Sequence, residues 1–117
     1  MILLFFRTAV SDTGLKKEGR TGMKRLHCDV YGKVQNCGFR DFCWRCSRKA
    51  GVSGWAANDI SDHSHIVLEA QGEEGQLEKF FSLLLKGDGR CRIDSVQKTE
   101  MPVSSEEKGF EARYRIQ

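Results

Sequence analysis

The sequence lacks any long apolar run. In the opening segment MILLFFR, five apolar residues follow Met1, and no basic residue precedes them. Such a run is too short for the apolar core of a secretory signal and far too short to cross a membrane. No internal repeat or low-complexity block is visible either. The sequence therefore predicts a soluble protein with no membrane partner.

A strong charge of one sign is also missing. The 19 Lys and Arg residues against 16 Asp and Glu residues leave a net charge of +3, and the basic residues are dispersed. No run of aromatic residues suggests a platform on which bases stack, so a nucleic-acid partner is disfavoured. The mild positive charge slightly favours small anionic ligands. A length of 117 residues with 39% hydrophobic content is typical of one globular domain with one core.

Complete metal-ligand patterns are absent as well. The five cysteines are Cys28, Cys37, Cys43, Cys46 and Cys91. An odd count without a secretory signal predicts reduced thiols and a cytoplasmic location. Cys43 and Cys46 are spaced as in a redox or metal motif, but no second cysteine pair completes a zinc site, and on a predicted helix both thiols are expected to face the core or its rim. His63 and His65 are interpreted as part of a solvated turn. We expect no metal and no cofactor.

Periodicity predicts the first elements. Residues 25–32 alternate, with Leu26, Cys28 and Val30 on one face, which is typical of a half-buried strand. From Phe39 the period changes to that of an amphipathic helix, which ends before Gly51. The helical face carries Phe39, Phe42, Cys43, Cys46 and Ala50.

The rest of the chain continues the same alternation of elements. Residues 52–58 and 65–72 are predicted strands of a hairpin, and 73–87 contain a second helix with Leu77, Phe80, Phe81 and Leu84 on one stripe. Strands are also predicted within 90–102 and 108–116. This β-α-β-β-α-β order predicts an α+β, ferredoxin-like split sandwich. Both helices then cover one face of a mainly antiparallel sheet, with a short extra C-terminal strand.

Two segments are expected. Residues 1–22 are polar and without periodicity after the first few residues, and they are interpreted as a flexible N-terminal extension. Residues 23–117 form the domain, so Met23 is a candidate initiator. The ferredoxin-like fold hosts many functions and says nothing decisive about chemistry.

The segment GKVQNCGFR, residues 32–40, joins the first strand to the first helix. Backbone N–H groups in such a loop can converge on an anion, and the helix N-terminus adds unpaired donors. Arg40 lies in the first helical turn, where a cation meets the positive end of the helix dipole. A bound phosphate, gripped by the guanidinium, would explain this placement. The alternative is an ordinary connector with a surface arginine.

This segment resembles the acylphosphatase signature G-x-V-Q-G-V-x-F-R. The matching residues are Gly32, Val34, Gln35, Phe39 and Arg40. A second family motif is matched by Gly54, Trp55 and Asn58. The family's A-R-I-D-x-V and F-x-I-R-Y strands are echoed by residues 91–96 and 110–114, so the resemblance covers roughly residues 24–115.

The resemblance implies a metal-independent hydrolase of the carboxyl–phosphate bond, with the ferredoxin-like fold. By resemblance, the phosphoryl group is bound by Lys33, Val34, Gln35, Asn36, Cys37, Gly38, Phe39 and Arg40, and Asn58 holds the attacking water. The partners are then a small-molecule acyl phosphate and inorganic phosphate. We expect a monomer.

The sequence departs from the family pattern at three places. Asn36 replaces a glycine and Cys37 replaces a valine. The hairpin after Asn58 lacks its usual glycine and is about two residues longer, a change that loops tolerate. Because Cys37 lies beside Arg40 and a helix N-terminus, we expect a reactive thiolate whose oxidation or alkylation blocks the site.

These departures keep two alternatives open. The first is a phosphate-binding module of the same fold with weak or no activity. The second is a domain like the acylphosphatase-like segments of hydrogenase-maturation carbamoyltransferases, which the short chain and the lack of a second domain disfavour.

Overall fold

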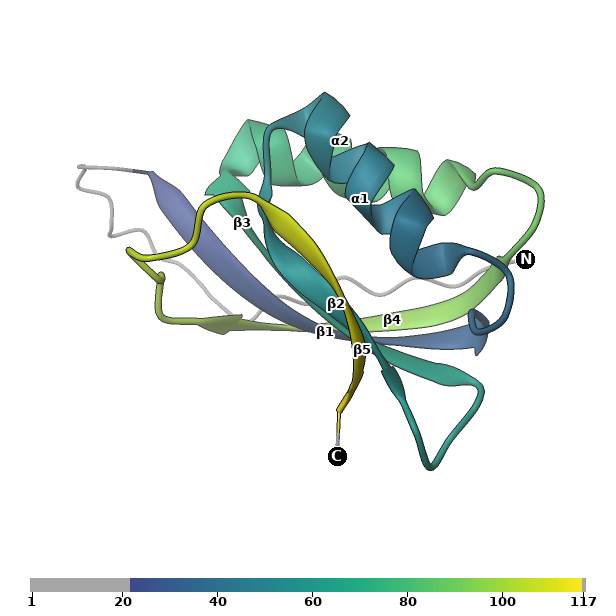
Figure 1. Ribbon diagram of the computed structural model, residues 1–117. Helices are drawn as coiled ribbons and strands as arrows, with labels where there is room; N and C mark the ends of the chain where they lie inside the picture. Colours follow the sequence, from purple (N-terminus) through teal and green to yellow (C-terminus); the bar gives the residue numbers. More distant parts are fainter. Residues whose placement is uncertain (1–21, 117) are drawn as a thin grey trace.

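The computed structural model describes residues 22–116. Figure 1 shows two layers, with both helices on one face of a five-stranded sheet. The elements are β1 (Met23–Lys33), α1 (Phe39–Ala50), β2 (Ser53–Asp59), β3 (His65–Glu73), α2 (Glu74–Lys86), β4 (Arg92–Met101) and β5 (Phe110–Ile116). The predicted order of elements is confirmed. The expected extension 1–22 lies, except for Gly22, outside the described residues.

The strand order of the sheet is β4-β1-β3-β2-β5. β3 pairs antiparallel with both β1 and β2, and β4 pairs antiparallel with β1. β5 is parallel to β2. β1 and β2 are therefore parallel strands with β3 between them, which is the split β-α-β arrangement of the ferredoxin-like fold. The predicted fold class is confirmed.

The end of α1 and the start of α2 lie where the local sequence favours them. α1 ends at Gly51, whose φ of 80° is left-handed and whose N–H donates to the Ser47 carbonyl over 2.8 Å. α2 begins with a capping box, in which the side chains of Glu73 and Gln76 each accept from the other's backbone N–H. Neither helix is long and apolar enough to cross a membrane within residues 22–116.

The core lies between the helices and one face of the sheet. All of the apolar side chains predicted for the two helical stripes are buried, and so are Leu26, Cys28 and Val30 of β1. Cys43 and Cys46 are free thiols that pack in this core. Burial raises the pKa of Cys28 to about 12 and that of Cys46 to about 11, so both remain protonated and apolar in character.

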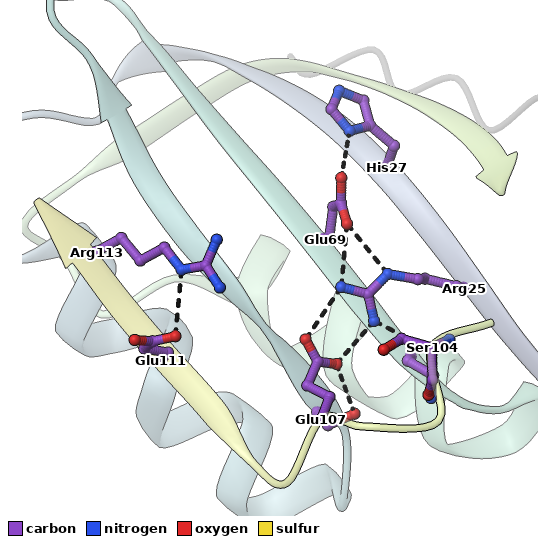
Figure 2. Close-up of polar contacts among 9 residues, drawn as sticks. Arg25, His27, Glu69, Ser104, Glu107, Glu111 and Arg113 are labelled. Carbon is purple, nitrogen blue, oxygen red and sulfur yellow. Dashed lines mark hydrogen bonds and ion pairs between the residues drawn. The ribbon is translucent and has the colours of Figure 1, made fainter. Parts of the chain in front are cut away.

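The opposite face of the sheet holds a buried cation that the sequence pattern does not reveal. Arg25 of β1 is only 4% exposed. It makes two parallel hydrogen bonds to Glu107, at 2.7 and 3.0 Å, and a third to Glu69 of β3 at 3.0 Å. Figure 2 shows Arg25 between these two carboxylates, with His27 on the far side of Glu69.

Glu107 belongs to residues 102–109, which connect β4 to β5. Two hydrogen bonds between Gln71 and the backbone of Ser104, at 2.8 and 2.9 Å, hold the same connection against β3. The Arg25 ion pairs therefore anchor the segment that leads into β5 (Figure 2). A buried charge of this kind needs its partners, because a lone ion away from water is costly.

We predict that Arg25→Met lowers the free energy of unfolding by about 3 kcal/mol, because Glu69 and Glu107, whose side chains are only 12% and 15% exposed, lose this cation. Urea denaturation measures the loss. The control is Lys24→Met on the same strand, which removes only an exposed ion pair to Glu74 at 3.9 Å and should cost about 0.5 kcal/mol or less. Equal losses of unfolding free energy in the two variants would contradict a stabilising role of the Arg25 ion pairs.

Candidate active site

The loop of residues 34–38 lies on the surface between two buried anchors. Val34 is 1% exposed and Phe39 is 2% exposed, so both ends of the loop are packed into the core. Lys33, Asn36 and Gly38 are exposed. The backbone between the anchors is therefore accessible to a ligand, while its position is determined by buried side chains.

The loop has the backbone geometry of an anion-binding nest. Asn36 has a φ of 62° and Gly38 a φ of 82°, whereas Cys37 between them does not have a positive φ. Within the described residues, the N–H groups of residues 34–38 donate no hydrogen bond to the protein. α1 starts directly afterwards, and no side chain caps its N-terminus. Unpaired donors of the loop and of the helix thus occur together.

Gln35 ties this loop to the β2–β3 hairpin. Its Nε2 lies 2.9 Å from the Asp59 carbonyl, 3.0 Å from the Asp62 carbonyl and 2.9 Å from the His65 carbonyl. At the base of the loop, the Gly32 N–H donates to the Ser64 carbonyl over 2.9 Å. The carboxamide nitrogen of Gln35 is thus occupied by the hairpin, which leaves the backbone N–H of Gln35 as its donor for an anionic ligand.

Arg40 reaches from the first turn of α1 to the edge of the sheet. Its Nη1 donates to the carbonyl of Arg113 on β5. In the register of the parallel pair, Arg113 lies opposite Ala57 of β2, and Asn58 is the next residue along that strand. The fold therefore brings Arg40 and Asn58, 18 positions apart in the sequence, to the same edge of the molecule.

Asn58 lies at an irregularity of its strand. The β2–β5 register shifts between Ala57 and Asn58, and bulges of this kind re-aim side chains and are common next to active sites. Asn58 is half-buried, and its carboxamide makes no hydrogen bond to another residue in the described part of the chain. A neutral amide placed in this way is suited to orient a water molecule.

The longer hairpin turn needs no glycine. Asp59 Oδ1 accepts a hydrogen bond from the Ser61 N–H, and Asp62 Oδ1 accepts one from the Ser64 N–H, each over 2.9 Å. These local bonds shape the turn, and in residues 22–116 Asn36 is the only non-glycine residue with a positive φ. The missing glycine is therefore compensated by side-chain hydrogen bonds rather than by strain.

The interpretation of His63 and His65 as one solvated turn is wrong for His65. His63 is exposed, but His65 is the first residue of β3 and is buried, with both ring nitrogens next to carboxylates. The signal was the sequence itself, since His65 precedes Ile66 at the start of an apolar strand. Within residues 22–116 there is no group of three or more side chains arranged to hold a metal ion.

Comparison with known proteins identifies the family of this chain. The profile of the acylphosphatase family matches residues 26–112. This chain belongs to the acylphosphatase family. The acylphosphatase of Leuconostoc mesenteroides is 39% identical over 82 residues, which cover 69% of this chain and 89% of that protein. That of Rubrobacter xylanophilus is 32% identical over 108 residues, which cover 92% and 94%.

A solved structure supports the same assignment. The structure of an acylphosphatase from Coxiella burnetii superimposes with a TM-score of 0.71 at 25% identity. The match covers 86% of this chain and all of that one. The family resemblance predicted from the two sequence motifs is therefore confirmed.

The expectation of five reduced thiols is wrong for two of them. Cys37 and Cys91 form a disulfide, with their Cα atoms 5.6 Å apart. Cys37 is therefore no reactive thiolate in this state. The available signal was that both residues replace apolar residues of the acylphosphatase pattern, a valine in the loop and an alanine before β4. The disulfide links the loop covalently to the start of β4.

We predict that the disulfide stabilises the fold, because it closes a segment with a sequence separation of 54. The chain-entropy model gives a stabilisation of roughly 4 kcal/mol for a loop of that length. A thiol reductant should therefore lower the Tm of the wild type in a thermal melt. Cys37→Val with Cys91→Ala restores the acylphosphatase pattern and keeps the three buried thiols, so its Tm should not respond. An equal response would contradict the prediction.

Proposed function

We propose that this protein hydrolyses acyl phosphates to a carboxylate and inorganic phosphate. The proposal is supported most by an open backbone nest directly before Arg40, whose guanidinium reaches the strand pair that carries Asn58, in a chain of the acylphosphatase family. The substrates are small molecules in which a carboxyl group is joined to phosphate. The backbone nest and Arg40 recognise the phosphoryl end, so the site imposes little selection on the acyl group.

The proposed binding step uses the loop amides and one side chain. The N–H groups of residues 33–39 point at the equatorial phosphoryl oxygens, and the dipole of α1 favours the negative charge. Arg40 supplies a permanent positive charge next to those oxygens. Its contact with the Arg113 carbonyl supports this role, because it orients the guanidinium toward the β2–β5 edge.

In the proposed chemical step, Asn58 orients a water molecule for in-line attack on phosphorus. The phosphorus–oxygen bond to the carboxylate breaks as the bond to water forms, and the water protons pass to phosphate and solvent. Phosphoryl transfer depends mainly on positioning and charge stabilisation. Because a carboxylate leaves readily, no strong general acid is needed, and a neutral amide is sufficient to hold the nucleophile.

We predict that Arg40→Gln and Asn58→Ala each lower kcat for benzoyl phosphate by about 10²–10³, since each removes a preorganised group from the transition state. Arg40→Gln should also raise the inhibition constant of inorganic phosphate, whereas Asn58→Ala should leave it nearly unchanged. The assay is run in the presence of a chelator.

The matched control is Arg45→Gln, which removes an exposed arginine of the same helix that pairs with Asp41. It should leave kcat and phosphate inhibition unchanged. If the wild type is no faster than Arg40→Gln while phosphate still binds, the alternative of an inactive phosphate-binding module is correct. If Arg40→Gln also leaves the inhibition constant of inorganic phosphate unchanged, the proposed site is wrong.

The substitution of Asn36 for the family glycine should have little effect on catalysis. Asn36 already adopts the left-handed conformation, with a φ of 62°, and its side chain is exposed. Asparagine is the residue that tolerates this conformation best after glycine. We predict that Asn36→Gly changes kcat by less than about threefold and raises stability by no more than about 1 kcal/mol. A much larger gain in kcat would mean that Asn36 obstructs the phosphate.

The protein is further proposed to act as a monomer in the cytoplasm without a nucleic-acid partner. Dispersed basic residues support the last point. The three free thiols of Cys28, Cys43 and Cys46 are compatible with the cytoplasm, whereas the disulfide between Cys37 and Cys91 does not support that location.

A further inference from the structure

His65 lies where three strands meet on the helix-free face of the sheet. Its Nδ1 is 2.7 Å from Asp59 Oδ2, at the end of β2, and its Nε2 is 2.7 Å from Asp29 Oδ1 on β1. The ring stacks on Tyr31, with centroids 4.6 Å apart and planes inclined by 14°. Only 9% of the residue is exposed. One imidazole thus connects β1, β3 and β2.

This arrangement requires a protonated ring. Ionised carboxylates only accept hydrogen bonds, and a neutral imidazole has one N–H and one acceptor nitrogen. Two carboxylates at 2.7 Å are both satisfied only by an imidazolium, which donates from both nitrogens. Burial lowers the pKa of His65, but the hydrogen bonds to Asp59 and Asp29 outweigh it, so the pKa lies above its usual value.

Asp59 connects His65 to the candidate site. It follows Asn58 directly in β2, and both of its carboxylate oxygens are occupied, Oδ2 by His65 and Oδ1 by the Ser61 N–H and hydroxyl. Its carbonyl is one of the three that surround the Gln35 carboxamide. The position of Asp59 therefore affects the strand end that carries Asn58 as well as the anchor of the phosphate loop.

We propose that protonated His65 is a positioning residue of the hydrolytic site, which holds Asp59 against Asp29 and so keeps Asn58 aligned with the phosphate loop. The inference rests on the proposed function of Arg40 and Asn58 and names a residue outside the family motifs. His65 does not touch the substrate, and it acts through the end of β2.

The alignment that protonated His65 maintains depends on pH, and kcat should fall as the pH rises. The titratable groups that face His65 are Asp29 and Tyr31 from β1, Asp59 from β2 and Asp62 from the turn. His65 lowers the pKa of Asp59 to about 2, and burial raises that of Tyr31, so neither titrates near neutral pH. Because the folded pKa of His65 is raised, the alignment is complete below the ordinary histidine pKa. It is lost as the pH rises through the raised value.

Three variants test the inference with benzoyl phosphate from about pH 6 to about pH 9. His65→Gln is neutral and should lower kcat by about tenfold to a hundredfold. The phosphate inhibition constant should change by less than about twofold, because the backbone carbonyls of Asp62 and His65 still hold Gln35. His65→Arg keeps a permanent cation with several donors. It should retain the wild-type kcat at neutral pH and lose the decline seen in the wild type at high pH. His63→Gln, the exposed neighbour, should behave as the wild type.

The results separate this inference from the proposed function. A wild type no faster than Arg40→Gln overturns both. If the wild type is active, two results overturn the positioning role alone. One is a His65→Gln variant with the kcat of the wild type. The other is a His65→Arg variant whose kcat declines at the same pH as that of the wild type. Nitrogen NMR of the wild type reports the protonation state of the His65 ring directly, so this test needs no variant to fold. Both ring nitrogens of His65 should be protonated at neutral pH, and a neutral tautomer there overturns the inference.

Discussion

The contact between the Gln35 carboxamide and three carbonyls of the β2–β3 hairpin is the constraint on which the site depends. A loop that is to bind an anion must leave its own N–H groups unpaired, so hydrogen bonds donated by those groups cannot hold it in place. The loop is held from outside instead, by the buried side chains of Val34 and Phe39, by Gln35 and by the disulfide of Cys37. The conformation of the loop is thus fixed in advance by the residues around it rather than by hydrogen bonds from its own N–H groups.

The helix-free face of the sheet is organised by two buried cations, Arg25 and His65. Each lies between two carboxylates that come from different segments of the chain. Arg25 anchors the connection into β5, whose Arg113 carbonyl accepts from Arg40, and His65 anchors the end of β2. The apolar core holds the helices to the sheet, whereas these ion pairs align the strand ends at which the proposed chemistry takes place.

The elements of the fold could be predicted because their signals are local. A helix from Phe39 to Ala50 follows from an apolar stripe and the glycine after it, and the strands follow from alternation over a few residues. The loop and Arg40 were likewise recognisable, because a cation in the first turn of a helix is unusual without an anion. Asn58 could be proposed as a site residue only through its match to a family motif.

The sequence by itself therefore determined the order of elements, the apolar stripes and the family, since each depends on neighbours in the chain. The tertiary structure alone decided the burial of Arg25, the protonated bridge at His65 and the pairing of Cys37 with Cys91. The most distant partner of each is 82, 36 and 54 positions away, respectively. Contacts at such separations leave no periodic trace, and a charged residue on an alternating strand is indistinguishable from a solvated one until the fold supplies its counter-charge.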